Sequence, residues 1–258
     1  MGSNGKIMNY IAKAFAIILI FALIYLIGYG IHRDKVINKS GEQTTVGQKV
    51  EQKVTKKKVV ISDNKINKNK NWLAIGDSIT VRNEYQKYVK QSCGFANVTT
   101  IAANGITLHL MDDKITKESL KNIDVVTVFA PANDFGWSRP LGAIDDPTTV
   151  DTFYSDMKCV IKNIKELKPG VKLIFITTPY IGQDGYGFSK NTVGCGLEDY
   201  NKAMKEVCAL SKIPILDLYT NSGINSKNLL KYSDDSVSPN DVGMKLIGTK
   251  IGEFLNTH

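Results

Sequence analysis

Histidine is scarce in this sequence: only His32, His109 and His258 occur in 258 residues. The four cysteines form no C-x-x-C pair, and no histidine lies at metal-ligand spacing from them, which argues against a zinc site. The sequence also lacks a G-x-G-x-x-G or P-loop pattern, so it implies no nucleotide cofactor. We therefore expect a protein that works without a metal or cofactor.

Acidic residues are sparse in the first quarter of the chain, and this imbalance explains the net charge of +8. Residues 1–32 carry only Lys6 and Lys13, residues 33–70 carry eleven basic and four acidic side chains, and residues 71–258 are almost neutral. The positive charge thus lies in a polar connector and not in the part with a globular composition. This distribution argues against nucleic acid as a partner.

One long apolar run interrupts the polar beginning of the chain. Residues 14–31 contain no formal charge and span ~27 Å as a helix, close to the ~30 Å hydrocarbon core. With residues 11–13 the run predicts a single membrane-spanning signal-anchor within residues 1–32. A cleaved signal peptide is the alternative, but its apolar stretch is usually shorter and a small-residue cleavage site follows it.

Residues 33–70 are rich in Lys, Asn, Gln, Thr and Ser and contain no aromatic residue. Such a segment cannot bury enough apolar surface to offset its ordering entropy, so we expect a flexible basic stalk. Basic residues flank the apolar run on both sides, and counting them alone places the following domain in the cytoplasm.

Residues 71–258 are long enough for one α/β domain with a substantial core. Apolar runs with strand character alternate with helical patterns, which predicts a parallel sheet covered on both faces: a three-layer, flavodoxin-like α/β/α sandwich with five strands. The expected strands are 72–75, 98–101, 125–129, 171–177 and 213–218. The expected helices are 82–92, 114–121, 151–167, 197–210 and 240–255.

The first of these strands stops at a Gly-Asp-Ser turn, residues 76–78. A buried strand that delivers a serine to its carboxyl end is a common way to present a nucleophile on an open α/β sheet. The same turn could instead only cap the following helix, with Asp77 or Ser78 bonding free N–H groups.

Further motifs follow at the ends of later strands. They are Gly105 after the second strand, Asn133-Asp134 after the third, and Asp235 with Pro239-Asn240 before the last helix. Together with Gly76-Asp77-Ser78 they resemble, in order and spacing, the four motif blocks of the SGNH, or GDSL-type, esterases and lipases. The resemblance covers about residues 71–258. Within the family, the sequence is similar to the Gram-positive members.

The resemblance implies a role for each matched residue. Ser78 would attack an ester carbonyl, and the backbone N–H groups of Ser78 and Gly105 with the side-chain amide of Asn133 would form the oxyanion hole. Asp235 would orient a histidine three residues later, and that histidine would take the serine proton. Asp134 would serve the structure by capping the adjoining loop.

The histidine is not there. The family pattern Asp-x-x-His-Pro-Asn reads Asp235-Ser236-Val237-Ser238-Pro239-Asn240, so a hydroxyl replaces the general base. Locally, Ser238 has the features of a helix N-cap, followed by Pro239 at the first helical position. A second departure is Pro131, which stands where the third block usually has glycine and which could displace the loop that carries Asn133.

Several consequences of the missing histidine stay open. The chain could be a catalytically silent relative that binds an acylated or glycan ligand, or a slow hydrolase that keeps the catalysis of its oxyanion hole. His109, four residues after Gly105, could swing in as a substitute base, although a lone histidine beside leucines is more often packed or on the surface. The serine could also be an engineered change, but Pro131 argues for natural drift.

The resemblance predicts hydrolysis of an acyl ester, on a cell-envelope glycan or a lipid, by a membrane-anchored domain on the extracytoplasmic side. The sequence indicates no oligomeric state. The four cysteines would permit one or two disulfides there, while buried free thiols are equally ordinary. Long Gly-rich loops at 135–150 and 179–196 are expected to shape a pocket, with Trp137, Tyr180 and Tyr186 as candidate lining residues.

Overall fold

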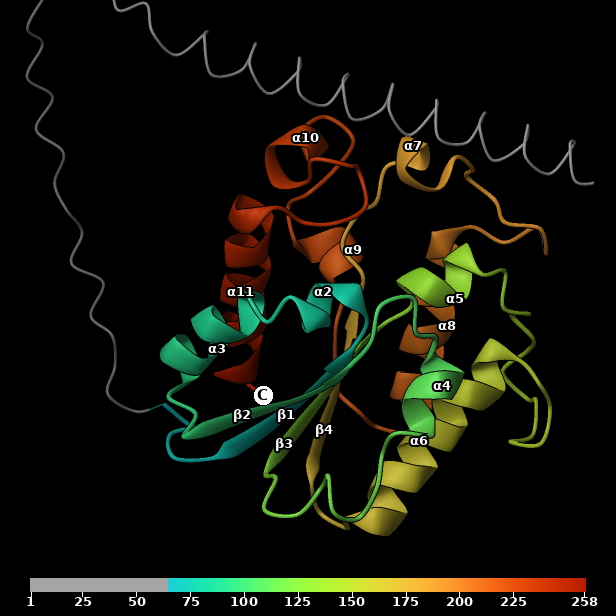
Figure 1. The fold of residues 1–258 in the computed structure, drawn as a ribbon. Helices are drawn as coiled ribbons and strands as arrows, with labels where there is room; N and C mark the ends of the chain where they lie inside the picture. The colour runs from blue at the N-terminus through green and yellow to red at the C-terminus, as the bar shows by residue number, and fades with distance from the viewer. Residues whose placement is uncertain (1–64) are drawn as a thin grey trace, which may run out of the picture. The chain divides into compact units, whose positions relative to one another are not determined.

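Five short apolar strands form one parallel sheet at the centre of the fold (Figure 1). A computed structural model describes residues 65–258. The order across the sheet is β2-β1-β3-β4-β5, the doubly wound order in which ligands bind beyond the carboxyl ends of the strands. The strands are β1 (Asn71–Gly76), β2 (Asn97–Ala102), β3 (Val125–Ala130), β4 (Lys172–Thr177) and β5 (Ile215–Leu216).

Helices cover both faces of the sheet, so the predicted three-layer α/β/α arrangement is confirmed. α3 (Tyr85–Cys93) and α11 (Asp241–Leu255) pack on one face, and α4 (Leu108–Asp112), α6 (Phe153–Leu167) and α8 (Leu197–Leu210) cover the other. Successive residues of each inner strand point to opposite layers, because side chains alternate along a strand. Leu73 and Ile75 thus enter the core under α6, and Trp72 and Ala74 enter the core under α11.

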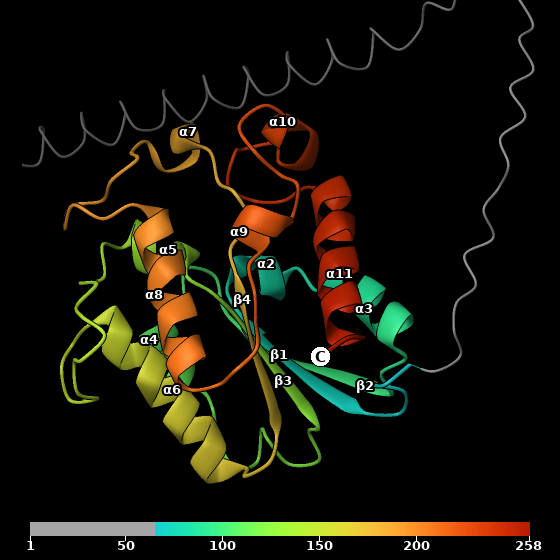
Figure 2. The ribbon, with the colours of Figure 1, turned by 180° about the vertical axis from the view of Figure 1, so that it is seen from behind.

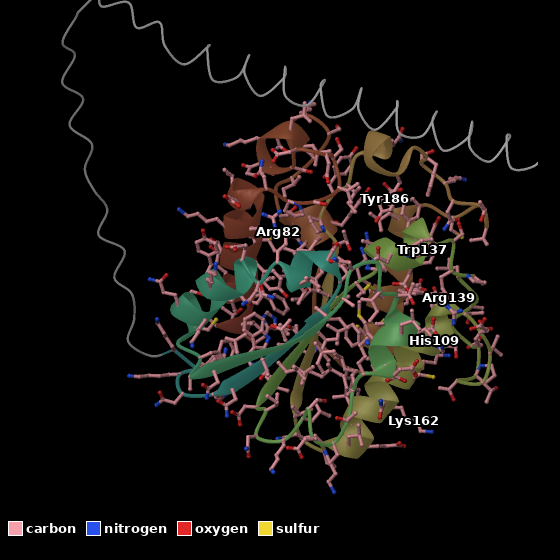
Figure 3. All side chains as sticks on the ribbon, viewed as in Figure 1. Arg82, His109, Trp137, Arg139, Lys162 and Tyr186 are labelled. Atoms are coloured by element: carbon pink, nitrogen blue, oxygen red, sulfur yellow. The ribbon has the colours of Figure 1, made fainter. Side chains whose placement is uncertain are left out.

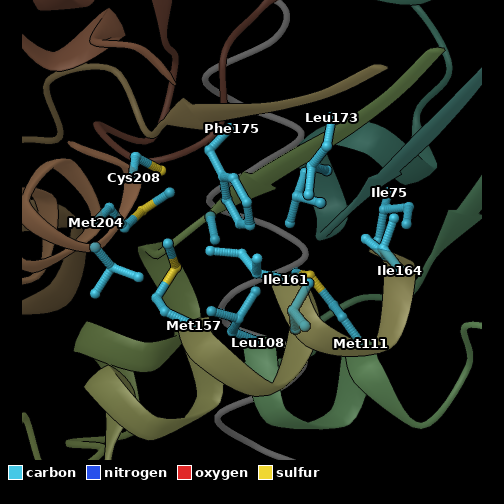
Figure 4. Packing of buried hydrophobic residues seen from close by; sticks show 14 of the residues in the cluster. Ile75, Leu108, Met111, Met157, Ile161, Ile164, Leu173, Phe175, Met204 and Cys208 are labelled. Carbon is cyan, nitrogen blue, oxygen red and sulfur yellow. The ribbon is translucent and has the colours of Figure 1, made fainter. Parts of the chain in front are cut away.

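The larger core lies between the sheet and α4, α6 and α8 (Figure 4). There Met111, Met157 and Ile164 from the helices belong to one buried hydrophobic cluster with the strand residues Ile75 and Phe175. The opposite core is more aromatic: the rings of Trp72 and Phe95 stack at 5.4 Å, and the indole N–H of Trp72 donates to Thr127 Oγ1 at 2.9 Å.

Most short elements gather at the carboxyl end of the sheet, as the view from behind also shows (Figure 2). They are α2 (Ser78–Val81), α5 (Ala132–Gly136), α7 (Gln183–Tyr186), α9 (Leu218–Asn221) and α10 (Leu229–Tyr232). None of them belongs to a predicted helix. They are too short to show the apolar periodicity on which a sequence-based prediction rests.

Three predicted elements differ from the structure. Residues 114–121 form turns and not a helix, since Thr116 and Ser119 exchange side-chain hydrogen bonds with each other's backbone N–H groups. The helix predicted from residue 82 begins at residue 85, because Asn83 takes a left-handed φ of 55° that separates α2 from α3. The last strand is reduced to two residues after Pro214, which has no N–H to donate.

Residues 65–70, the end of the predicted stalk, pack against the domain: Asn67 is fully buried, and its side-chain amide donates to the carbonyl of Leu255 at 2.5 Å. Within residues 65–258 no helix combines the length and apolar character needed to cross a bilayer. The predicted anchor at 11–31 and the stalk before residue 65 lie outside the described residues. All four cysteines are free thiols, and Cys93 and Cys208 are buried, so neither of the disulfides considered above is formed.

Gly248 lies where α11 approaches α3 closely. A Cβ at this position would lie 2.7 Å from the carbonyl oxygen of Tyr85, a backbone atom that cannot move aside. We predict that Gly248→Ala lowers the free energy of unfolding by about 1–3 kcal/mol through overpacking. Urea denaturation checks this value. Thr249→Ala, at the exposed next position, is the control and should leave stability unchanged or slightly higher. Equal stability of the two variants would contradict the prediction.

Candidate active site

Three of the four sequence-predicted site residues follow neighbouring strands at the same edge of the sheet. Gly76, at the end of β1, pairs with Ala102 of β2 and Phe129 of β3, so these strands end at one level. Ser78 lies two residues beyond β1, Gly105 three residues beyond β2, and Asn133 three residues beyond β3. Parallel pairing therefore carries all three to one edge.

The turn that presents Ser78 is fixed by its neighbours. A Cβ on Gly76 would lie 2.2 Å from Thr80 Oγ1, so only glycine lets α2 fold back tightly onto β1. Asp77 caps α2 through a 3.0 Å bond from the N–H of Ile79, as the capping interpretation of this turn expected. Burial raises the pKa of the Asp77 carboxyl to about 6, although that bond opposes the shift. Ser78 itself stays partly exposed at the first position of the helix.

Hydrogen bonds join the loop of Gly105 to α5, which carries Asn133. The side-chain amide of Asn133 donates to the carbonyl of Ile106 at 3.1 Å, and the indole N–H of Trp137 donates to the carbonyl of Gly105 at 3.1 Å. An amide nitrogen carries two hydrogens, so this bond leaves Asn133 a second N–H to donate. Gly105 has a φ of +70°, a conformation that L side chains rarely adopt. The carbonyl of Pro131 accepts the N–H of Phe135 in the first turn at α5.

Asp134, on α5, also links this helix to the segment that follows Gly105. Its carboxyl accepts the N–H of Leu108 at 3.0 Å, which gives it the structural role expected from the sequence. The side chain is buried, and its second oxygen has no hydrogen-bond partner among the described residues. Burial raises the pKa of Asp134 to about 8, with the Leu108 bond opposing and the charge of Asp156 adding to the shift. This carboxyl is therefore largely protonated near neutral pH.

The fourth predicted residue, Asp235, holds a tight loop before α11. Its Oδ1 accepts the N–H of Ser238 at 2.6 Å, the N–H of Val237 at 2.9 Å and the hydroxyl of Ser233 at 3.2 Å. Partial burial alone would raise the pKa of Asp235, but these hydrogen bonds outweigh it and hold the pKa below its usual range. The carboxylate is thus ionised and oriented toward residue 238.

Ser238 is not the N-cap of the last helix, which corrects the expectation from the sequence. Asn240 is the N-cap: its side chain accepts the N–H of Gly243 at 3.1 Å, and α11 begins at Asp241. Pro239 pairs with Ser233 in an isolated bridge, which keeps it outside the helix. The hydroxyl of Ser238 is therefore free of a capping duty and lies on the wall of a pocket.

That pocket brings the first and last motif blocks together. It has a volume of about 200 Å³, and both Ser78 and Ser238 line it, with Asn104 and Arg82. A second hollow of about 360 Å³ borders Gly105 and shares Asn104 with the first. A ligand at Ser78 thus has space on two sides of this residue, one toward residue 238 and one toward Gly105.

Arg82 is the site residue that sequence reasoning missed. It lies at the C-cap of α2 and donates to the carbonyl of Pro239 at 2.6 Å and to Asp241 Oδ1 at 3.3 Å, so it joins α2 to the loop of Ser238. Figure 3 shows its side chain between α2 and α11. No sequence signal identified it, because its partners are more than 150 residues away along the chain.

His109 lies elsewhere. Its Nδ1 is 3.4 Å from Asp156 on α6, within an ion-pair cluster in which Arg139 also contacts Asp156. Figure 3 shows His109 and Arg139 together beside α4, on the far side of the sheet from Arg82. Within residues 65–258, His109 has no hydrogen bond to Ser78. This position fits the interpretation of a surface histidine and not that of a substitute base.

The long loop after β4 shapes the opposite border of the site. Tyr186 donates to the carbonyl of Ala132 at 3.1 Å, and its ring would lie 2.6 Å from a Cβ on Gly136, so α7 is held close against α5. Tyr180 and Tyr186 line a hollow of about 130 Å³, as expected from the sequence. Trp137 does not line it: the indole is 71% exposed and instead lies over Gly105.

The profile of the GDSL-like lipase/acylhydrolase family matches residues 74–246, which include all four motif blocks. The chain therefore belongs to the GDSL-like lipase/acylhydrolase family. No curated protein sequence matches the chain significantly.

Solved structures share the fold. A protein from Lactobacillus plantarum superposes with a TM-score of 0.67 at 25% identity, over 74% of this chain and 98% of the other. A lipase/acylhydrolase from Enterococcus faecalis has a TM-score of 0.58 at 21% identity, over 73% and 96% of the two chains. An acetyl xylan esterase has a TM-score of 0.54 at 18% identity, over 71% and 98%.

The buried carboxyl of Asp134 gives a test of the site's electrostatics. Its folded pKa of about 8 exceeds the unfolded value of about 3.9, so the folded protein binds more protons between these pH values. This contribution makes the free energy of unfolding fall as pH rises from about 4 to about 8. We predict that Asp134→Asn, which keeps the acceptor for Leu108, makes this decline shallower.

Urea denaturation at several pH values measures the slope. Asp113→Asn, at an exposed position of the neighbouring turn, is the control and should keep the slope of the unmodified protein. If Asp134→Asn keeps that slope too, the carboxyl of Asp134 is ionised in the fold and the assignment is wrong.

Proposed function

We propose that this protein is a serine ester hydrolase in which Ser78 attacks the carbonyl of an acyl ester. One observation supports this most directly: Ser78 lies on the wall of a pocket at the carboxyl edge of the sheet, beside the loop of Gly105 and Asn133. The backbone N–H groups of Ser78 and Gly105 and the free N–H of Asn133 are the donors for the oxyanion. Donors fixed around a developing charge each contribute about 2.7–4 kcal/mol in other acyl-transfer enzymes.

The general base is the unusual part of the proposal. Asp235 is ionised and bonded to residue 238, but that residue is serine, whose hydroxyl does not take up a proton near neutral pH. The position of Ser238 in the pocket of Ser78 supports the interpretation that a base at 238 would reach the nucleophile. A base in this role typically contributes 10²–10⁴-fold in rate.

A second candidate function is ligand binding without turnover. The observation in its favour is the same serine at 238, since the pocket and the oxyanion donors would still bind an ester or a glycan. We also propose a site of action at a membrane, with an anchor at residues 11–31 and the domain on the extracytoplasmic side. The apolar run of the sequence supports the anchor, and the resemblance to the Gram-positive esterases supports the extracytoplasmic side, whereas the count of basic residues around the run favours the opposite orientation.

The nucleophile test compares the full chain with Ser78→Ala. We predict that a fluorophosphonate probe labels the unmodified chain and that this chain slowly hydrolyses short-chain nitrophenyl esters. Ser78→Ala should lose both the labelling and the hydrolysis. The labelled peptide, identified by mass spectrometry, should contain Ser78. Labelling that persists in Ser78→Ala would contradict the role of this serine, and absence of turnover in the unmodified chain would favour the ligand-binding candidate.

The base test restores the imidazole. We predict that Ser238→His raises kcat on a neutral nitrophenyl ester by about 10²-fold or more, because Asp235 already orients this position. The double variant Ser78→Ala with Ser238→His is the matched control and should be inactive. His109→Ala should leave turnover unchanged, because its side chain contacts Asp156 and not the pocket. A loss of activity in His109→Ala would instead identify it as the base.

A further inference from the structure

The pocket beside Ser78 is lined by hydrogen-bond donors. Ser78, Ser238, Asn104 and Arg82, which carry two hydroxyls, an amide and a guanidinium, all line it. Among the described residues on its wall there is no carboxylate and no imidazole. A wall with one permanent cation and three neutral donors favours an anion over a cation.

Arg82 keeps binding capacity for such an anion. A guanidinium has five N–H donors, and the structure uses one nitrogen for the carbonyl of Pro239 and another for Asp241. The carboxylate of Asp241 is 91% exposed, so water screens this ion pair and leaves the charge of Arg82 only weakly compensated. The bond to Pro239, in contrast, fixes the guanidinium next to Ser238.

The rest of the pocket wall is apolar. Ile79 and Pro239 are buried and Met244 is fully inaccessible, so these groups hold water away from one side of the pocket. A lower local dielectric strengthens an ion pair formed there. The Arg82 side chain is itself 41% exposed, so the ion pair with a ligand anion is shielded from water only on the side formed by these apolar groups.

We propose that this pocket binds a carboxylate carried by the ester substrate, and that this carboxylate accepts the proton of Ser78. The inference rests on the proposed function, since it gives the missing base to the substrate itself. A carboxylate suits the site because its two oxygens match the planar N–H pair of a guanidinium. An ammonium base is disfavoured, because Arg82 would repel it.

The proton and bond balance is complete. As Ser78 Oγ bonds to the ester carbonyl carbon, its proton passes to the substrate carboxylate, and the carbonyl oxygen becomes the oxyanion. When the tetrahedral intermediate collapses, the C–O bond to the alcohol breaks and the carboxylic acid returns the proton to the departing oxygen. Water then attacks the acyl-serine: its oxygen bonds to the acyl carbon and one of its protons passes to the carboxylate in the pocket. As the Oγ–C bond breaks, this proton moves to Ser78 Oγ and the acid is released. When the carboxylate belongs to the alcohol half, that alcohol stays in the pocket until this step is complete.

The experiment uses the full chain and three esters of similar size. 4-Nitrophenyl hemisuccinate carries the carboxylate in the acyl half, 3-carboxy-4-nitrophenyl butyrate carries it in the alcohol half, and 4-nitrophenyl butyrate is neutral. We expect kcat/KM for at least one acidic ester to exceed that for the neutral ester by tenfold or more after correction for their spontaneous hydrolysis. The preferred ester identifies the half that carries the carboxylate.

Variants locate this preference in the pocket. Arg82→Gln should reduce the acidic-to-neutral ratio to about one, whereas Lys87→Gln, which removes an exposed charge on the next helix, should leave the ratio unchanged. Ser238→His should accelerate the neutral ester and lose the preference, because the imidazole occupies the pocket. If Arg82→Gln unfolds, inhibition by acetate is measured on the unmodified chain instead. Acetate should compete with the acidic ester for the pocket, whereas chloride at equal ionic strength should not.

The outcomes separate the two proposals. Turnover that depends on Ser78 but shows no acidic preference, or a preference that Arg82→Gln and Lys87→Gln lower equally, would overturn the carboxylate proposal alone. An absence of acetate inhibition beyond that of chloride would do the same. An absence of Ser78-dependent turnover with all three esters would overturn the proposed function together with it.

Discussion

The parallel pairing of β1 with β2 on one side and β3 on the other is the constraint on which the site depends. Because the three strands end at one level, the turns after them carry Ser78, Gly105 and Asn133 to the same edge. The hydrogen bonds of Asn133 and Trp137 to the Gly105 loop then fix the turns against each other. A shift of one residue in the pairing would move these turns. It would also turn every buried side chain of the shifted strand to the opposite face of the sheet.

The contact between the two ends of the domain completes the site. Arg82 on the nucleophile side holds the carbonyl of Pro239, and α11 packs closely on α3 through Gly248. The loop of Asp235 and Ser238 is therefore fixed at the pocket of Ser78, although it lies far away in the chain. Asp235 accepts the N–H of residue 238, which is serine in this chain.

The buried carboxyls of Asp77 and Asp134 stabilise the turns of the site, but their burial removes them from water. Each accepts a backbone N–H that fixes a turn, and each has a raised pKa because water cannot reach it. The protonated form of Asp134 fits its surroundings near neutral pH, whereas ionisation at higher pH would leave an uncompensated charge in the core. The supports of the site are thus also its most pH-sensitive groups.

The sequence by itself determined the alternating strands and helices and the four motif blocks, with serine at position 238, because these are local patterns of polarity and residue type. Long elements such as α8 were predicted with their observed bounds. The short helices around the site, the N-cap at Asn240 and the role of Arg82 were decided only by the tertiary structure. They depend on partners distant in the chain, such as Pro239 for Arg82, and no local pattern encodes which distant backbone group a side chain will meet.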